Sequence, residues 1–178
     1  MSIAAAEGHG AARTALAGAV VKARARALLP VMVAIWIFSG GFVLIEPSPY
    51  EFVFVLVLPV ALLGGLQLYR GTLNLFNLLV VFIPFAVIGA FQPVNTAVLP
   101  SLVYVVVTFF LWFTAYFAAN YLAENPLRRF DGIMKSYTVA ALIVAMIGTL
   151  AYLGLIPGRD LFLRYQRAKA TFQDPNVY

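Results

Sequence analysis

The chain has 178 residues, of which 63% are apolar and only 11% are charged, and its mean hydropathy is +0.93. A soluble domain carries about 45–50% apolar and about 25% charged residues, so the composition excludes an ordinary soluble globular protein. The 12 Lys and Arg outnumber the 7 Asp and Glu, and in so apolar a chain we relate this excess to membrane topology rather than to nucleic acid. With no Cys and one His, metal sites lack their usual ligands, and we expect no metal, no cofactor and no nucleic-acid partner.

Five apolar runs of 18 to 26 residues contain no Asp, Glu, Lys or Arg. They cover residues 28–45, 52–69, 73–91, 97–122 and 136–156. A helix of about 20 residues crosses a hydrocarbon core about 30 Å thick. The runs therefore predict an all-α, polytopic transmembrane bundle of five spans over residues 28–156, between an N-terminal tail (1–27) and a C-terminal tail (157–178). The glycine pairs Gly40-Gly41 and Gly64-Gly65 predict close backbone approach between these helices.

The basic residues predict the orientation of the bundle. With the N-terminus in the cytoplasm, the inner face carries eight Lys and Arg: Arg13, Lys22, Arg24, Arg26, Arg70, Arg128, Arg129 and Lys135. The outer face then carries four, which are Arg159, Arg164, Arg167 and Lys169. Because cytoplasmic segments are enriched in Lys and Arg, this distribution predicts a multi-pass protein with a cytoplasmic N-terminus and an extracytoplasmic C-terminal tail.

Polar side chains inside the runs are few and uncharged. Thr108, Thr114 and Asn120 lie in the fourth run, and hydrogen bonding between helices accounts for such residues. Ion-coupled transporters usually carry an ionisable residue within the membrane. None occurs in these runs, and this weakens the interpretation of the chain as a transporter or channel subunit.

The C-terminal tail carries the strongest functional signal. Helical spacing over residues 160–172 would place apolar side chains on one face, and Asp160, Arg164 and Arg167 on another. This pattern predicts an amphipathic helix lying in the outer membrane interface. Its arginines either anchor the helix at the membrane surface or bind an anion, since the planar guanidinium suits a bidentate phosphate contact.

The last residues of the chain resemble a known motif. The run from Arg167 to Tyr178 is similar to the segment R-x-x-G-x-F-x-x-P-N-x-x-G of the O-antigen ligase and polymerase family of bacterial inner-membrane proteins, and its matching residues are Arg167, Phe172, Pro175 and Asn176. Ala170 stands where that pattern has Gly.

This resemblance implies a glycosyltransferase of lipopolysaccharide biosynthesis in the inner membrane, which takes glycan from a polyprenyl-diphosphate donor at the periplasmic face. It implies that Arg167 lies near the donor diphosphate, and that Pro175 and Asn176 shape a turn into a sixth span. Because Arg164 lies on the same face of the predicted tail helix, we expect it to assist Arg167 in binding the diphosphate. Family members are longer and carry their catalytic residues in a large periplasmic loop. The chain is therefore expected to be an N-terminal fragment with no catalytic residues of its own and inactive alone, whose partners are membrane lipid, the lipid-linked glycan and further transmembrane helices.

Two other interpretations remain open. The chain is alternatively a small integral membrane protein that acts by helix-helix interaction or in assembly, or a transporter subunit. Nothing in the sequence distinguishes ligase from polymerase or identifies the sugar and its acceptor.

Overall fold

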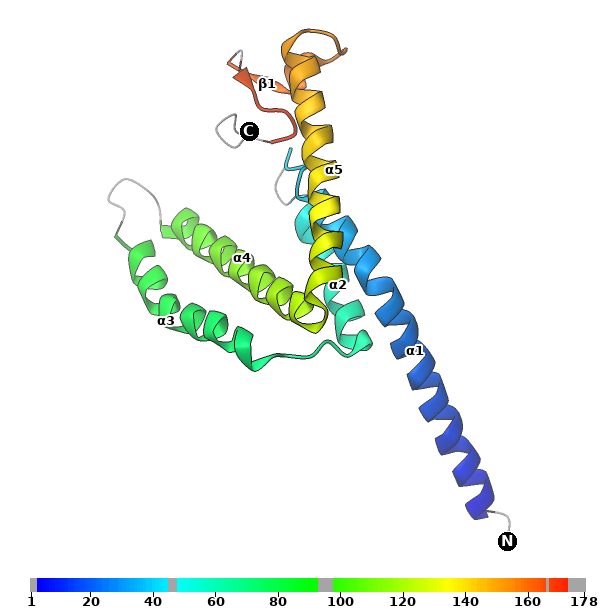
Figure 1. Ribbon diagram of the computed structural model, residues 1–178. Coiled ribbons are helices and arrows are strands. Elements are labelled where there is room, and N and C mark those ends of the chain that lie inside the picture. Colours follow the sequence, from blue (N-terminus) through cyan, green and yellow to red (C-terminus); the bar gives the residue numbers. More distant parts are fainter. Residues whose placement is uncertain (1–2, 45–47, 93–97, 166, 173–178) are drawn as a thin grey trace. The chain divides into compact units, whose positions relative to one another are not determined.

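The computed structural model describes residues 3–44, 48–92, 98–165 and 167–172 (Figure 1). Its regular structure is almost entirely helical, as the composition predicts. The five α-helices of the described residues are α1 (Ile3–Ser39), α2 (Pro49–Gly64), α3 (Leu73–Ala90), α4 (Val98–Glu124) and α5 (Pro126–Tyr152). Short 3₁₀ turns, η1 (Arg70–Thr72) and η2 (Arg159–Leu161), and two strands, β1 (Leu163–Arg164) and β2 (Arg167–Ala168), complete it.

Each of the five apolar runs corresponds to one helix, but not every helix has the length of a span. Within the described residues, three helical segments are long and apolar enough to cross a membrane: Arg70–Ala90, Ser101–Glu124 and Pro126–Tyr152. This indicates a membrane protein. Helix α1 runs without a break from the basic N-terminal segment into the first apolar run and ends at Ser39, six residues before that run does. Helix α2 has 16 residues.

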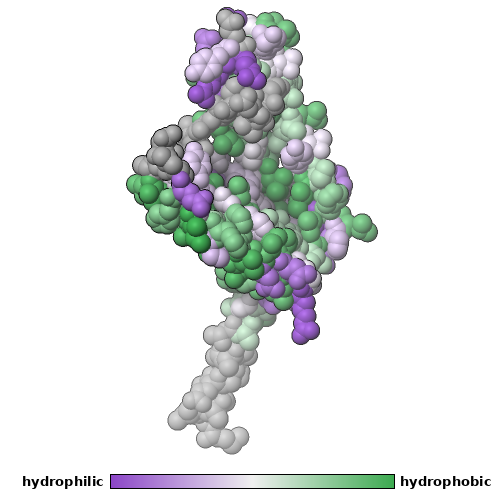
Figure 2. All heavy atoms as spheres, turned by 90° about the vertical axis from the view of Figure 1, so that its left-hand side faces the viewer, coloured by the Kyte–Doolittle hydropathy of each residue, from purple (hydrophilic) through white to green (hydrophobic). Residues whose placement is uncertain are grey.

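The exposed surface of the helices is apolar. Large apolar side chains are exposed on every helix, among them Val31, Leu62, Phe85, Tyr104 and Leu142. Figure 2 shows hydrophobic side chains over much of the helices, with hydrophilic ones gathered at the top of the view, over the tail, and again at the lower right. A helix that is apolar on all sides suits a lipid environment.

The chain divides into two compact units, and the first comprises residues 1–65 and 128–178. Its centre is the antiparallel pair α1 and α2. The Trp36 ring lies 5.3 Å from the Tyr50 ring and 4.9 Å from the Phe54 ring, measured between centroids. Leu29 and Val33 on α1 are buried beside them. These are the contacts through which the two helices hold each other.

Both ends of α2 are closed by specific contacts. At its start Ser48 is the N-cap, and the Glu51 carboxylate accepts a hydrogen bond from the Ser48 N–H, which satisfies one of the free amides of the first turn. At its end Gly65 adopts a left-handed conformation (φ +75°), which costs glycine nothing. There Arg26 donates from Nε to the Gly64 carbonyl at 2.8 Å. At Gly64 a Cβ added to the backbone would lie 3.5 Å from Arg26 N and 3.6 Å from Ala25 C. The two helices therefore approach closely here, as expected, although at a distance that a small side chain would also allow.

The second unit, residues 66–127, contains η1, α3 and all of α4. Asn120 is fully buried in α4. Its Oδ1 accepts the Tyr69 N–H at 2.9 Å and lies 2.8 Å from the Thr72 hydroxyl, and its amide nitrogen donates to the Tyr116 carbonyl. Asn120 thus joins the chain before α3 to α4. The sequence also predicted hydrogen bonds between helices for Thr108 and Thr114, and this prediction is wrong. Their hydroxyls bond to the Tyr104 and Leu111 carbonyls of their own helix, because a Thr hydroxyl readily reaches the preceding turn.

Candidate functional site

The candidate site is the tail hairpin (Phe162–Ala170) together with Thr171 and Phe172, which attach the tail to the turn after α1. The predicted amphipathic helix over residues 160–172 is wrong: after the 3₁₀ turn η2 the chain forms the antiparallel strands β1 and β2. Tyr165 and Ala170 both have positive φ, +53° and +48°. A right-handed helix cannot pass through either of these residues. The apolar and charged residues of the tail thus recur at helical spacing although its backbone is not helical.

The hairpin brings Arg164 and Arg167 together by another route. Arg164 pairs directly with Arg167, and Leu163 with Ala168, across the two strands. Directly opposed residues of an antiparallel pair project from the same face with Cβ atoms about 4.5–5.5 Å apart. Both arginines are exposed. Arg164 and Arg167 are therefore neighbours, as predicted, but across a β-hairpin and not along a helix.

The electrostatics of this face favour an anion. Two like charges directly opposed across a β-pair destabilise it, and a bound anion removes that repulsion. The Arg164 guanidinium carbon lies 5.5 Å from the centroid of the Tyr165 ring, within the range of a cation–π contact. Asp160 is 3.9 Å from Arg159 Nε, in the turn that precedes the hairpin. The chemistry that this arrangement provides is a charge-assisted, forked contact to phosphate or carboxylate.

A bulge at the base of the hairpin turns the chain toward the helices. The Phe162 carbonyl accepts two hydrogen bonds, from the Lys169 N–H at 3.0 Å and the Ala170 N–H at 3.1 Å. Two residues of one strand thus face a single residue of the other, as in a β-bulge. Ala170 is fully buried at this point and left-handed. The bulge directs the following residue, Thr171, into the protein.

Thr171 fixes the tail to the turn after α1. It is 2% exposed, its hydroxyl donates to the Gly41 carbonyl, and its own carbonyl accepts the Val43 N–H at 2.9 Å. The pairing of Val43 with Phe172 extends this contact. The tail is therefore held by one side-chain and one main-chain hydrogen bond, over a separation of more than a hundred residues in sequence.

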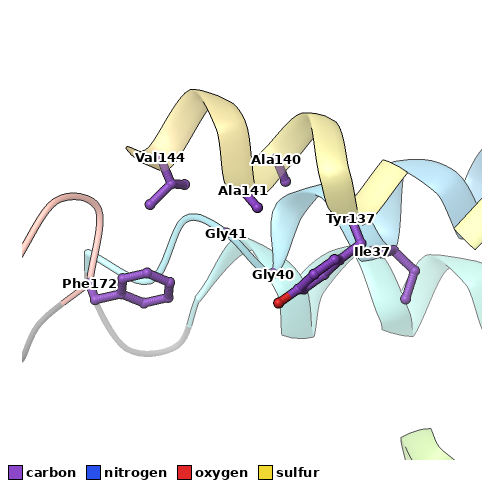
Figure 3. Close-up of a pocket in the computed structure, with 8 residues that line it drawn as sticks. All are labelled: Ile37, Gly40, Gly41, Tyr137, Ala140, Ala141, Val144 and Phe172. Atoms are coloured by element: carbon purple, nitrogen blue, oxygen red, sulfur yellow. The ribbon is translucent and has the colours of Figure 1, made fainter. Parts of the chain in front are cut away.

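Next to this contact lies an apolar pocket of about 270 Å³ (Figure 3). The residues that line it come from the end of α1, from one face of α5 and from the tail: Ile37, Gly40, Gly41, Tyr137, Ala140, Ala141, Val144 and Phe172. The close approach expected at Gly40-Gly41 is confirmed here, because a Cβ built on Gly41 would lie 3.2 Å from Val144 Cγ2 and 3.3 Å from Ala140 Cβ. Phe172, which lines the pocket, follows the tail hairpin by two residues in the chain.

Pro175 and Asn176, the other two proposed motif positions, lie outside the described residues. Thr171 was not among the predicted site residues, because no pattern in the sequence gives a signal for it. Ala170 did carry one, since it occupies the position where the family motif has Gly. No family model, curated protein or solved structure matches this chain.

Proposed function

We propose that this chain is the donor-binding membrane part of an O-antigen ligase-like glycosyltransferase. In this proposal Arg164 and Arg167 hold the diphosphate of a polyprenyl-linked glycan at the extracytoplasmic face of the bacterial inner membrane, and Pro175 and Asn176 form the turn after it. The role of the chain is binding of the donor, and we expect no glycan transfer by residues 1–178 alone.

The observation that carries the proposal is the backbone at Ala170. The family motif asks for Gly at this position, and here Ala170 is left-handed, with φ +48°, and completely buried. Left-handed backbone is the conformation that favours Gly over every residue with a Cβ. A physical requirement of the fold and the motif thus coincide at one residue, and this agreement is independent of the Arg and Pro-Asn matches.

The geometry of the arginines supports the same ligand. A diphosphate offers several charged oxygens within the span of two guanidinium groups, and charge-assisted forked contacts are the strong class of hydrogen bond. The tail that carries the two arginines also contributes Phe172 to the apolar pocket. Apolar surface beside a cationic hairpin suits an amphiphile with a prenyl chain and an anionic head.

The proposal includes an orientation. All five helices are embedded in the membrane, with the N-terminus of α1 in the cytoplasm and the tail outside, as the excess of basic residues on one side predicts. Reporter fusions at positions 71 and 165 test it, because position 71 should report the cytoplasm and position 165 the outer face. The opposite result would place the hairpin on the wrong side for a periplasmic donor.

Binding of a defined probe tests the function. Farnesyl diphosphate, a short polyprenyl diphosphate, is titrated against the chain in nanodiscs, with farnesol as the ligand that lacks the phosphates. Arg167→Lys keeps the charge but loses the fork. Since a hydrogen bond to a charged group contributes about 1.5–3 kcal/mol, we expect Arg167→Lys to raise the Kd about tenfold or more.

Arg159→Lys is the matched control, since Arg159 lies in the same tail but outside the hairpin and should bind the probe like wild type. Equal affinity of wild type, Arg167→Lys and Arg167→Ala for farnesyl diphosphate would show that the arginines only anchor the tail, and would refute the proposal.

A further inference from the structure

The strand register of the tail hairpin continues as far as Lys169. Arg164 pairs with Arg167 across the two strands. Two residues further from the turn, the same register pairs Phe162 with Lys169. The Lys169 N–H donates to the Phe162 carbonyl at 3.0 Å, which is a bond that this antiparallel register requires. The extra residue of the bulge is Ala170, so the strand geometry holds up to Lys169.

Lys169 therefore lies on the same face of the hairpin as the two arginines. Residues two apart in a strand share a face, and Lys169 follows Arg167 by two residues. On the opposite face Leu163 and Ala168 are half-buried, whereas both arginines are exposed. Lys169 is half-buried, which suits a lysine whose aliphatic stem rests on protein while its ammonium group stays in water.

The three cations form a triangle. Arg164 and Arg167 are directly opposed, with Cβ atoms about 4.5–5.5 Å apart. Arg164 and Lys169 are diagonal neighbours, about 7–8 Å apart. Arg167 and Lys169 are separated by two residues of one strand, which is about 7 Å. These separations lie within the reach of three long side chains, so one ligand can contact all three.

The charge of this face is not balanced by nearby carboxylates. Between Asp160 and Asp174 the chain contains three cations and neither Asp nor Glu. Lys169 forms no ion pair with a carboxylate of the described residues. Like charges on neighbouring positions of a β-pair repel each other. An anion with two phosphate groups relieves this repulsion more fully than an anion with one.

The family motif assigns no role to Lys169. Its position is one of the two undefined positions between the Arg and the Gly of the motif. Helical spacing would also place Lys169 away from the arginines, because residues two apart do not face each other on a helix. Only the strand register of the hairpin brings this third cation to the site.

We propose that Lys169 is a third ligand of the bound anion and that it gives the hairpin a preference for a diphosphate over a monophosphate. Arg164 and Arg167 hold one phosphate through forked contacts, and Lys169 binds the second as a point charge. This inference rests on the proposed function, because it concerns the anion that the two arginines bind.

The ratio of two dissociation constants tests the inference. Farnesyl diphosphate and farnesyl phosphate are titrated against the whole chain in nanodiscs of zwitterionic phosphatidylcholine. Lys169→Met keeps the aliphatic stem and removes the charge. It should raise the Kd for the diphosphate about tenfold or more, since a hydrogen bond to a charged group is lost. The Kd for the monophosphate, which the arginines hold, should change less than about twofold.

Two further variants serve as controls. Lys169→Arg keeps the positive charge and should retain the wild-type preference for the diphosphate. Arg159→Met removes one charge from the same tail but outside the hairpin, and should leave the ratio of the two constants unchanged. Inorganic diphosphate and phosphate, used as competitors, should depend on Lys169 in the same way, because the inference concerns the phosphate groups and not the prenyl chain.

An unchanged ratio in Lys169→Met would overturn the inference. An equal loss of affinity for both farnesyl ligands would also overturn it, since Lys169 would then only support the fold of the hairpin. A Lys169 effect confined to the farnesyl ligands would contradict the assignment to the phosphates. Failure of the proposed function looks different, because Arg167→Lys and Arg167→Ala would then bind farnesyl diphosphate like wild type, whereas failure of this inference leaves the effect of Arg167 in place.

Discussion

Thr171 gives the most direct test of how the tail is held. Thr171→Val keeps the shape of the side chain and removes the hydroxyl that donates to the Gly41 carbonyl. Hydrogen bonds between segments of membrane proteins contribute about 0.6 kcal/mol on average and up to about 1.7 kcal/mol. Because Thr171 is 2% exposed, water does not readily replace the lost partner, and we expect a value toward the upper end, about 1–1.7 kcal/mol. The tail should then open about fivefold to eighteenfold more often than in wild type.

Hydrogen exchange measured on peptides that cover residues 40–44 and 167–172 reports this opening. Exchange in both peptides should accelerate together in Thr171→Val, because the Val43 N–H bonds to the Thr171 carbonyl. Thr171→Ser retains the donor and should stay close to wild type. Unchanged exchange in Thr171→Val, or equal acceleration in Thr171→Ser, would refute the assignment of the tail's attachment to this hydroxyl.

Two further substitutions test the conformations that the fold requires. Ala170→Gly should leave the tail docked, whereas Ala170→Val should release it, because a β-branched residue is strongly disfavoured at φ +48°; equal proteolytic nicking of the tail in both would contradict this. Asn120→Leu removes the acceptor of the Tyr69 N–H and the Thr72 hydroxyl, and should lower the free energy of unfolding in detergent by about 1–3 kcal/mol. The control is Asn77→Leu, on the exposed face of α3, which should change this free energy by less than about 0.5 kcal/mol. Similar losses in the two variants would argue against the role of Asn120.

The helices of this protein follow from the sequence because the signal is local. Runs of apolar residues without charge leave the backbone no partner in lipid except its own hydrogen bonds, so each run becomes a helix. The helix boundaries follow in part from turn residues, as at Ser48 and Pro49, where a capping residue and a proline start α2. The end of α1 at Ser39 was not predictable from apolarity, because the run continues to Ile45 without any change in hydropathy.

The tail shows where periodicity fails. The residues from Asp160 to Phe172 fit a helical wheel, yet positive φ at Tyr165 and Ala170 excludes the helix. Whether a residue with a Cβ adopts a left-handed conformation depends on what holds it there. For Ala170 this is the Phe162 carbonyl on one side and the docking of Thr171 on the other.

The sequence by itself determined that the protein is helical and belongs in a membrane, and which residues carry its charge, because composition acts through a few residues at a time. Only the tertiary structure decided that Arg164 faces Arg167 across a β-hairpin, that Thr171 joins the tail to the turn after α1, and that Gly41 packs on α5 at Ala140 and Val144. The last two contacts join residues far apart in the chain, and no local pattern encodes them, since they depend on how three separate segments pack together. The hairpin register depends on the same packing, because the docked chain beyond Ala170 fixes the bulge that closes it.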